Sequence, residues 1–168
     1  QRVAQHVAEG AGGELLAIDA EGNLPEAGWE KLHAADAIIF GTPTYMGGPS
    51  WQFKKFADAS SKAWFTRAWQ DKVFGAFTNS ASPVGDKGAT LAQLQTLASQ
   101  HGGIWVSLGL LPANGKAATH ADINHLGGSV GLLVRSPSDA AVDEIPQGDL
   151  DTAKRYGQRI AAVALRLN

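Results

Sequence analysis

Cysteine is absent from this chain of 168 residues. Its absence excludes disulfide bridges, thiolate metal sites and cysteine nucleophiles, and it is consistent with a reducing compartment. No apolar run approaches the ~20 residues of a membrane-spanning helix, and no signal peptide is visible. We therefore expect a soluble, cytoplasmic protein without membrane insertion.

An excess of charge of one sign is lacking as well. Lysine and arginine number 14 and aspartate and glutamate 16, so the formal net charge is −2. This balance gives no electrostatic reason to expect binding to nucleic acid or to an anionic membrane. The sequence also has no Walker-type loop, no Gly-x-Ser-x-Gly elbow and no paired carboxylates at a useful spacing. We expect no metal site, and we expect four histidines without ligand spacing to lie at the surface: His6, His33, His120 and His125.

Apolar residues make up 44% of the chain, and its 20 glycines favour loops between regular elements. Helices are expected at 1–11, 25–33, 50–60, 90–100 and 147–167. Strands are expected at 14–18, 37–40, 73–77 with a continuation to 80, 104–108 and 131–134, with a long irregular insertion at 109–128. Strands that alternate with helices predict a parallel sheet covered on both faces, which is a three-layer, doubly wound α/β domain with right-handed crossovers.

The most informative segment covers residues 36–49. Residues 38–40 form a continuous apolar run, which is typical of a parallel strand buried on both faces. Pro43 and Pro49 are expected to stop regular structure, and the glycines around them allow close approach of the backbone to a ligand. Loops at the carboxyl ends of parallel strands are where open α/β sheets bind ligands. An ordinary strand-to-helix turn remains the alternative.

The start of the sequence is unusual for such a domain, because a helix comes first and a strand normally does. Either the domain begins with a helix, or a strand and its loop precede Gln1. Such a loop would lie at the N-terminus of the first helix, which is the natural phosphate site of these folds.

Residues 8–11 (Ala-Glu-Gly-Ala) and 36–44 (Asp-Ala-Ile-Ile-Phe-Gly-Thr-Pro-Thr) resemble the flavodoxin-like NAD(P)H:quinone oxidoreductases of the WrbA type. The resemblance extends along the chain through Gln52, Phe56, Asp58, Trp64, 97–98, 101–102, 127–128 and 151–167. It implies one flavodoxin-like domain over 1–168 with a five-stranded parallel sheet, whose first strand and phosphate loop would precede Gln1. It also implies FMN as cofactor, ping-pong hydride transfer from NAD(P)H to a quinone, and a homo-oligomer, either a dimer or a tetramer.

The resemblance implies a first flavin loop made of Pro43, Thr44, Tyr45, Met46 and Gly47. Its backbone amides would bind the polar edge of the ring, and Tyr45 or Met46 would pack on the ring face. The family often has Arg-Phe at 45–46 and Asn at 48. Tyr45 could instead cover the core.

A second flavin loop is implied at Thr78, Asn79, Ser80, Ala81 and Gly85. Hydroxyl and amide groups supply donors and acceptors without charge, which suits a neutral polar ring edge. The family has more glycine here than this chain. The same residues are also typical of a simple turn.

Two further residues are implied to act on the substrate. His101 is expected near the carboxyl edge beside the flavin, where it would donate a hydrogen bond or stabilise charge as a catalytic residue. A histidine before glycine at a helix C-terminus is also favoured by the helix dipole alone. Trp64 is expected to border the substrate slot, whereas Trp69 is expected to pack in the core or at a subunit interface.

Two other functions remain open at this point. The first is a flavodoxin-type electron carrier, and the second is a flavin-free interaction scaffold. Carriers tend to be strongly acidic so that they dock on basic partners, and a net charge of −2 favours the enzyme over the carrier.

Overall fold

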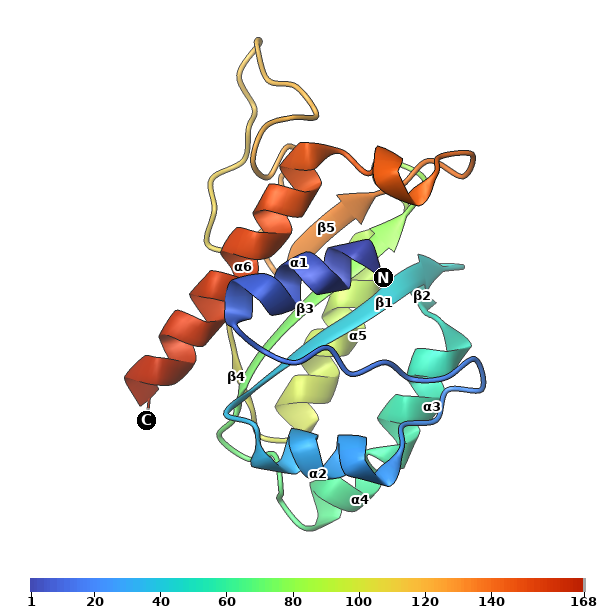
Figure 1. The fold of residues 1–168 in the computed structure, drawn as a ribbon, viewed down its shortest axis with the longest axis vertical. Coiled ribbons are helices and arrows are strands. Elements are labelled where there is room, and N and C mark those ends of the chain that lie inside the picture. Colours follow the sequence, from blue (N-terminus) through green and yellow to red (C-terminus); the bar gives the residue numbers. More distant parts are fainter. Residues whose placement is uncertain (168) are drawn as a thin grey trace.

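The computed structural model describes residues 1–167, which form an α/β domain (Figure 1). Its elements in chain order are α1 (Arg2–Ala11), α2 (Glu26–Ala34), β1 (Ala37–Tyr45), β2 (Gly48–Pro49), α3 (Trp51–Ala59), α4 (Ser61–Phe65), β3 (Val73–Ser80), α5 (Lys87–Gln100), β4 (Ile104–Trp105), β5 (Leu132–Arg135), a 3-10 turn (Val142–Glu144) and α6 (Gln147–Leu167). Within this described part of the chain, no helix is both long and apolar enough to cross a membrane.

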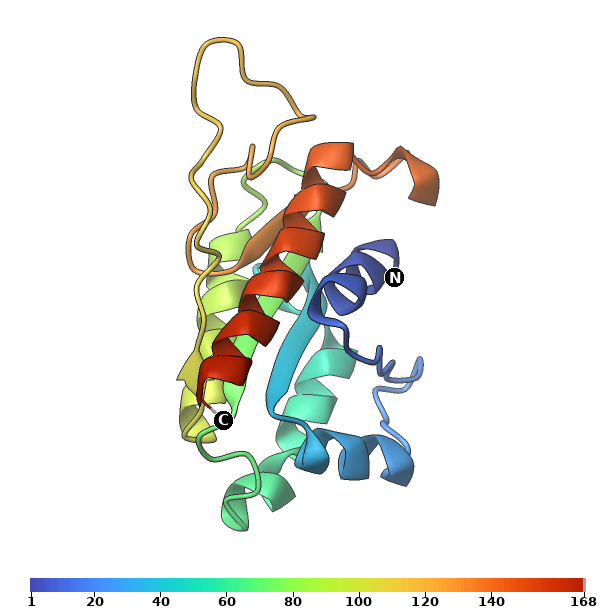
Figure 2. The same ribbon diagram turned by 60° about the vertical axis from the view of Figure 1, so that its left-hand side comes forward.

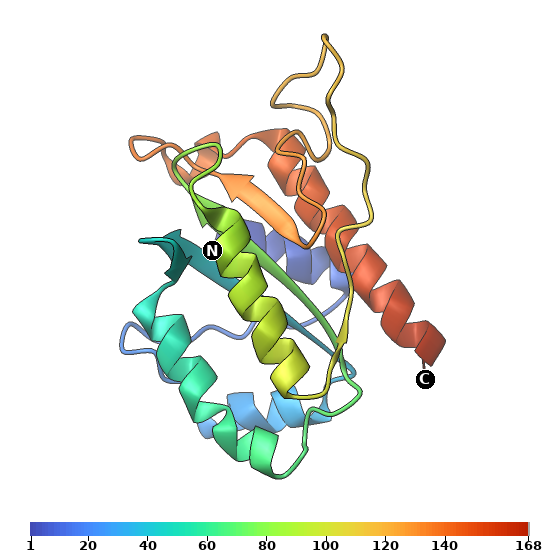
Figure 3. The same ribbon diagram turned by 180° about the vertical axis from the view of Figure 1, so that it is seen from behind.

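The sheet is built around β1 and β3, which run parallel from the pair Ala37–Val73 to the pair Pro43–Asn79. The other edge of β3 carries two short parallel strands, one after the other. β4 pairs with the beginning of β3 and β5 with its end, and Figure 3 shows both beside the same strand. β2 adds a short antiparallel pair at the end of β1.

Helices cover both faces of the sheet, as the alternation of elements predicts. α1 and α6 pack on one face, whereas α3 and α5 pack on the other (Figure 2). Successive residues of β1 supply the two cores in turn: Ile38 and Phe40 belong to the core under α3 and α5, and Ile39 packs against the core under α1 and α6. The doubly wound, three-layer arrangement is therefore confirmed.

Most helix boundaries agree with the sequence. Ser50 caps α3 by accepting a hydrogen bond from the backbone N–H of Phe53 at 3.3 Å, and α6 has the expected bounds. α5 begins at Lys87, before the expected start at 90, and α4 occupies a stretch for which no helix was expected. Trp69 is fully buried in the core, as expected.

Three strand predictions need correction. β1 continues through Pro43 to Tyr45, because this proline lies in the last register pair with β3, where a missing N–H costs little. The segment 14–18 is irregular rather than a strand, since residues 1–167 place no strand beside it to pair with. The strand expected at 104–108 is reduced to β4, after which the chain leaves the sheet.

Tyr156 of α6 connects the helix to the sheet and is fully buried. Its hydroxyl donates to the carbonyl of Val106 at 2.7 Å and accepts from the N–H of Ala76 at 3.3 Å. Burial raises the pKa of Tyr156 to about 12. The unfolded chain therefore loses this proton at lower pH than the native chain, so the free energy of unfolding should fall as pH rises from about 10 to 12.

We expect Tyr156→Phe to lower the free energy of unfolding by about 1–3 kcal/mol at pH 7, because two buried backbone groups lose their partner. The variant should also lose the part of the alkaline decline that this hydroxyl causes, roughly 2–3 kcal/mol between pH 10 and 12. Urea titrations of both proteins from pH 7 to pH 11.5 measure this. Parallel pH profiles for the two proteins would contradict it.

Candidate functional site

The carboxyl ends of β1 and β3 and the N-terminus of α1 lie at the same edge of the molecule (Figure 1). The first expected loop is a tight hairpin between β1 and β2, with Met46 and Gly47 in the left-handed region at φ 49° and 78°. Tyr45 is 65% exposed and Met46 is completely exposed, so neither covers the core. Both side chains are available to pack on a flat ligand.

The hydroxyl groups of Thr44 and Thr78 do not face this edge. Thr44 Oγ1 lies 2.7 Å from Thr78 Oγ1 and 2.8 Å from Thr90 Oγ1, and all three side chains are buried. These hydrogen bonds connect β1, β3 and α5 inside the domain. The expectation that the Thr78 hydroxyl binds the cofactor is therefore wrong, whereas the first loop, which includes Thr44, was expected to bind through its backbone amides.

Asn79 is the polar residue of the second loop that best fits a ligand. Its Nδ2 donates to Ser136 Oγ at 3.0 Å, whereas its Oδ1 is buried and has no hydrogen-bond partner among residues 1–167. An unsatisfied buried acceptor is costly, so this oxygen calls for a donor that the protein does not supply. Gly85 has φ 52°, and a Cβ there would overlap Ser80 Oγ, so the turn requires glycine.

A group of titratable residues behind the second loop was missed from the sequence. Lys87, Asp149 and His125 are all buried, and His125 Nε2 lies 2.9 Å from Asp149 Oδ1. Burial raises the pKa of Asp149 and lowers the pKa of Lys87. The sequence pattern treats such residues as exposed, and His125 in particular was expected at the surface. Only their placement beside strand and helix ends could have singled them out.

His101 does not lie at the carboxyl edge, and that prediction is wrong. It follows the C-terminal end of α5, which runs antiparallel to β3 and therefore ends at the opposite edge of the sheet. The His101 ring is buried 4.4 Å from the ring of Trp69, and Nε2 lies 3.0 Å from Ser60 Oγ. Burial lowers the pKa of His101, so the ring is neutral at pH 7.

Trp64 lies near the same end of the molecule as His101, on α4, and is 44% exposed. Its neighbour Phe65 is 83% exposed. Within one chain, Trp64 is thus separated from both expected flavin loops. A role beside the substrate requires a second copy of the chain.

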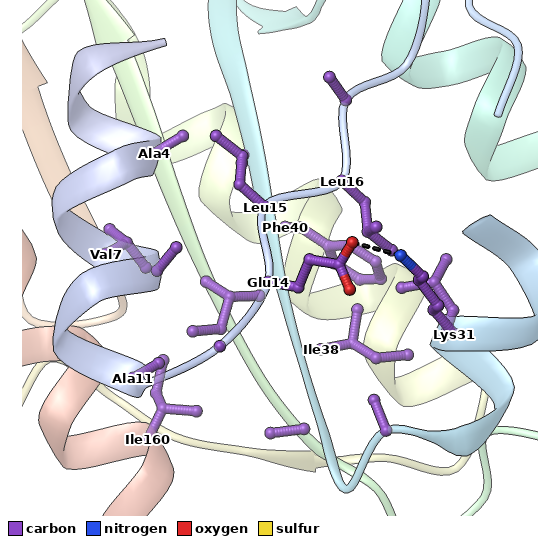
Figure 4. Close-up of a pocket in the computed structure, with 18 of the residues that line it drawn as sticks. Ala4, Val7, Ala11, Glu14, Leu15, Leu16, Lys31, Ile38, Phe40 and Ile160 are labelled. Carbon is purple, nitrogen blue, oxygen red and sulfur yellow. Dashed lines mark hydrogen bonds and ion pairs between the residues drawn. The ribbon is translucent and has the colours of Figure 1, made fainter. Parts of the chain in front are cut away.

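An apolar groove of about 970 Å³ runs along the free edge of β1 (Figure 4). Its walls are α1, the irregular segment 14–18 and α2, and its lining reaches from Gln1 at the carboxyl edge to Asp36 at the opposite edge. The ion pair between Lys31 and Glu14 crosses the outer side. Among the described residues, β1 has a partner strand on only one edge along 37–43, so the groove exposes a row of backbone hydrogen-bonding groups.

A smaller cavity of about 330 Å³ lies beside the first loop and is lined in part by Pro43, Tyr45 and Asp19. The edge thus combines a hollow, an exposed aromatic ring, the unsatisfied oxygen of Asn79 and neutral loop amides. This donor set fits FMN, whose ring carries uncharged carbonyl and N–H groups and whose ribityl chain carries hydroxyls.

Comparison with known proteins agrees with this geometry. Residues 3–134 match the family described as NADPH-dependent FMN reductase. The chain is 62% identical over its full length to flavodoxin FldP of Pseudomonas aeruginosa strain UCBPP-PA14, of which it covers 91%. It is 37% identical over 139 residues to an NAD(P)H dehydrogenase (quinone) of Archaeoglobus fulgidus, covering 82% of this chain and 64% of that protein.

Among solved structures, the crystal structure of the flavodoxin, WrbA-like protein from Agrobacterium tumefaciens superposes with a TM-score of 0.82 at 56% identity. The match covers 99% of this chain and 90% of that one. The chain therefore belongs to the NADPH-dependent FMN reductase family, has the flavodoxin-like fold of WrbA-type proteins, and uses FMN as its cofactor.

Proposed function

We propose that the protein is an FMN-dependent NAD(P)H:quinone oxidoreductase. The observation that carries this proposal is the open carboxyl edge, where the exposed side chains of Tyr45 and Met46 stand beside two loops of neutral polar groups. Flat, weakly charged molecules such as a quinone or a nicotinamide ring stack well on such a surface. Relatives named NAD(P)H dehydrogenase (quinone) support the assignment. The proposal includes a cytoplasmic location, where NAD(P)H is available.

FMN, when bound, supplies the hydride chemistry that protein side chains lack. The residues of this chain bind and orient. The backbone of residues 43–47 and 80–85 would hold the polar edge of the ring, and Asn79 Oδ1 would accept a hydrogen bond from an N–H or hydroxyl group. Tyr45 or Met46 would cover the ring face and keep water from it. NAD(P)H and quinone would use the remaining open side in turn, which gives ping-pong kinetics.

We also propose that the groove beside β1 holds a β-strand of the same polypeptide that runs directly ahead of Gln1. An unpaired strand edge of this length, facing an apolar groove, has the backbone groups and the lining that an added strand needs. Because α1 begins at the carboxyl edge, a strand leading into it ends there and runs parallel to β1. The loop between that strand and α1 would then bind the FMN phosphate at the helix N-terminus.

A homo-oligomer forms the last part of the proposal. Trp64 and Phe65 expose a patch of aromatic surface, and a second copy that brings this patch to the open edge would let Trp64 border the substrate slot. Sedimentation equilibrium of the full-length protein, with and without Trp64→Ser, tests this association.

The alternative is an electron-carrier flavodoxin, which the relative named flavodoxin FldP favours. Mixing the full-length protein with FMN, NADH or NADPH, and benzoquinone separates the two functions. We expect steady oxidation of the reduced nicotinamide that depends on quinone, with parallel double-reciprocal plots at different quinone concentrations. Tight binding of FMN without steady oxidation would identify a carrier instead.

A further inference from the structure

Lys87 occupies a position that is unfavourable for a lysine in two respects. Its side chain is fully buried, and it is the first residue of α5, where the helix dipole disfavours a positive charge. Residues that contradict the usual preferences for burial and for helix position are concentrated at functional sites. The ammonium group lies directly behind the second loop of the cofactor edge.

Hydrogen bonds from Lys87 account for all three of its protons. Nζ donates to Ser80 Oγ at 3.0 Å, to the carbonyl of Ser82 at 2.7 Å and to the carbonyl of Pro83 at 2.9 Å. The intervening carbonyl, that of Ala81, accepts from Nε of Arg135 at 3.2 Å. Two cations therefore hold four consecutive residues of the loop by their acceptors.

The donors of this loop are left unused. The backbone N–H groups of Ser82, Val84 and Gly85 have no hydrogen-bond partner within residues 1–167. Because the carbonyl groups of residues 81–83 are engaged by the two cations, these N–H groups remain available to a ligand at the carboxyl edge. Adjacent free N–H groups, such as those of Val84 and Gly85, form a site for an electron-rich group.

The positive charge of buried Lys87 is opposed by the negative charge of buried Asp149. The Asp149 carboxylate is 2% exposed and opposes the effect of burial, which lowers the pKa of Lys87. Asp149 is itself fixed, since its Oδ2 accepts from the N–H of Arg135 at 2.9 Å and its Oδ1 contacts His125. Arg135 thus joins the loop directly to the end of β5, and the charge of Lys87 is opposed by Asp149 at the start of α6.

We propose that Lys87 is a positioning residue for FMN: together with Arg135, it holds the Ser80 hydroxyl and the carbonyl groups of residues 81–83, so that the amides of the loop are preorganised to bind the polar edge of the flavin. Lys87 acts through the loop and does not contact the cofactor. The inference rests on the proposed placement of FMN beside this loop. Preorganisation of this kind raises affinity because the free protein need not order the loop on binding.

The chain contains a matched control in Lys72. This lysine also has a pKa lowered by burial, and its Nζ donates to the carbonyl groups of His33 and Ala35 at the opposite edge of the sheet. The substitution Lys72→Met removes hydrogen bonds from a partly buried ammonium group to backbone carbonyls, as Lys87→Met does, but far from the proposed cofactor loops. A purely structural role for lysine would therefore give similar results at both positions.

The experiment compares Lys87→Met, Arg135→Met and Lys72→Met in the full-length protein, with FMN binding measured by flavin fluorescence and loop order measured by hydrogen exchange. For Lys87→Met we expect a dissociation constant for FMN raised about 10- to 100-fold, with faster exchange of the amides of residues 81–86. Arg135→Met should raise the dissociation constant for FMN by a smaller factor, because it frees only the carbonyl of Ala81. Lys87→Arg should restore part of the affinity, and Lys72→Met should leave it within twofold.

Arg135 is only partly buried and its hydrogen bond to Ala81 is exposed, so its variant tests the inference even where Lys87→Met does not fold. Affinities within twofold of the parent for Lys87→Met, or for Arg135→Met where Lys87→Met does not fold, would overturn the inference while leaving the proposed function intact. Equal losses for Lys87→Met and Lys72→Met would overturn it as well. Failure of the parent protein to bind FMN would instead reject the proposed function itself.

Discussion

Gly157→Val is expected to separate α1 from α6 and to lower the free energy of unfolding by about 3 kcal/mol or more. The two helices cross with glycine on each side. A Cβ at Gly157 would overlap the carbonyl oxygen of Val7, and a Cβ at Gly10 would overlap that of Lys154. Only backbone lies at both contacts, so no side chain can move aside. Urea denaturation measures the loss.

The same substitution should weaken FMN binding more than the loss of stability alone requires. The N-terminus of α1 lies at the cofactor edge, so a shift of this helix moves one side of the site. Gly88→Ala is the matched control, because a Cβ at this helical position meets no atom within 4 Å. It should raise stability by about 0.5–1 kcal/mol and leave FMN affinity unchanged. Gly157→Val with parental stability would show that the helix crossing is not tight.

A polypeptide that extends ahead of Gln1 with the residues its gene encodes should bind FMN at least about 100-fold more tightly than residues 1–168 alone. The reason is that the proposed strand fills the groove beside β1, and its loop completes the phosphate site at α1. The amides of residues 37–41 should also exchange more slowly, since they gain a partner strand. Fluorescence titration and hydrogen exchange measure the two effects.

The control for this experiment is an extension of equal length made of glycine and serine, which has no tendency to form a strand. It should behave like residues 1–168. Equal FMN affinity for all three proteins would reject the strand. A gain with the glycine–serine extension would show that chain length alone is responsible.

Local chemistry made several features predictable. Ser50 could be identified as a cap because its hydroxyl suits the first turn of a helix, and the apolar run at 38–40 identified the central strand. The segment 14–18 could not be predicted correctly, because a strand depends on a neighbour and the described residues place none beside it.

In the candidate site, too, features set by neighbouring residues could be predicted, and features set by residues distant in the sequence could not. The two loops were found because they follow strands, but the inward direction of Thr44 and Thr78 depends on Thr90 of a later helix. His101 was misplaced because the resemblance outweighed a simple geometric rule: a helix after a parallel strand runs back, so its last residue is distant from the strand's end. Lys87 was missed because lysine is rarely buried.

The two short strands that share one edge of β3 have a practical consequence. The chain leaves the sheet after β4 and returns at β5 beside the same strand, so both ends of the excursion are anchored independently of its length. Asn124 closes its base by donating to the carbonyl groups of Leu110 and Gly128, each at 3.0 Å. A fluorophore or an affinity tag inserted at Gly115, where a Cβ meets no atom within 4 Å, would leave the architecture around it undisturbed.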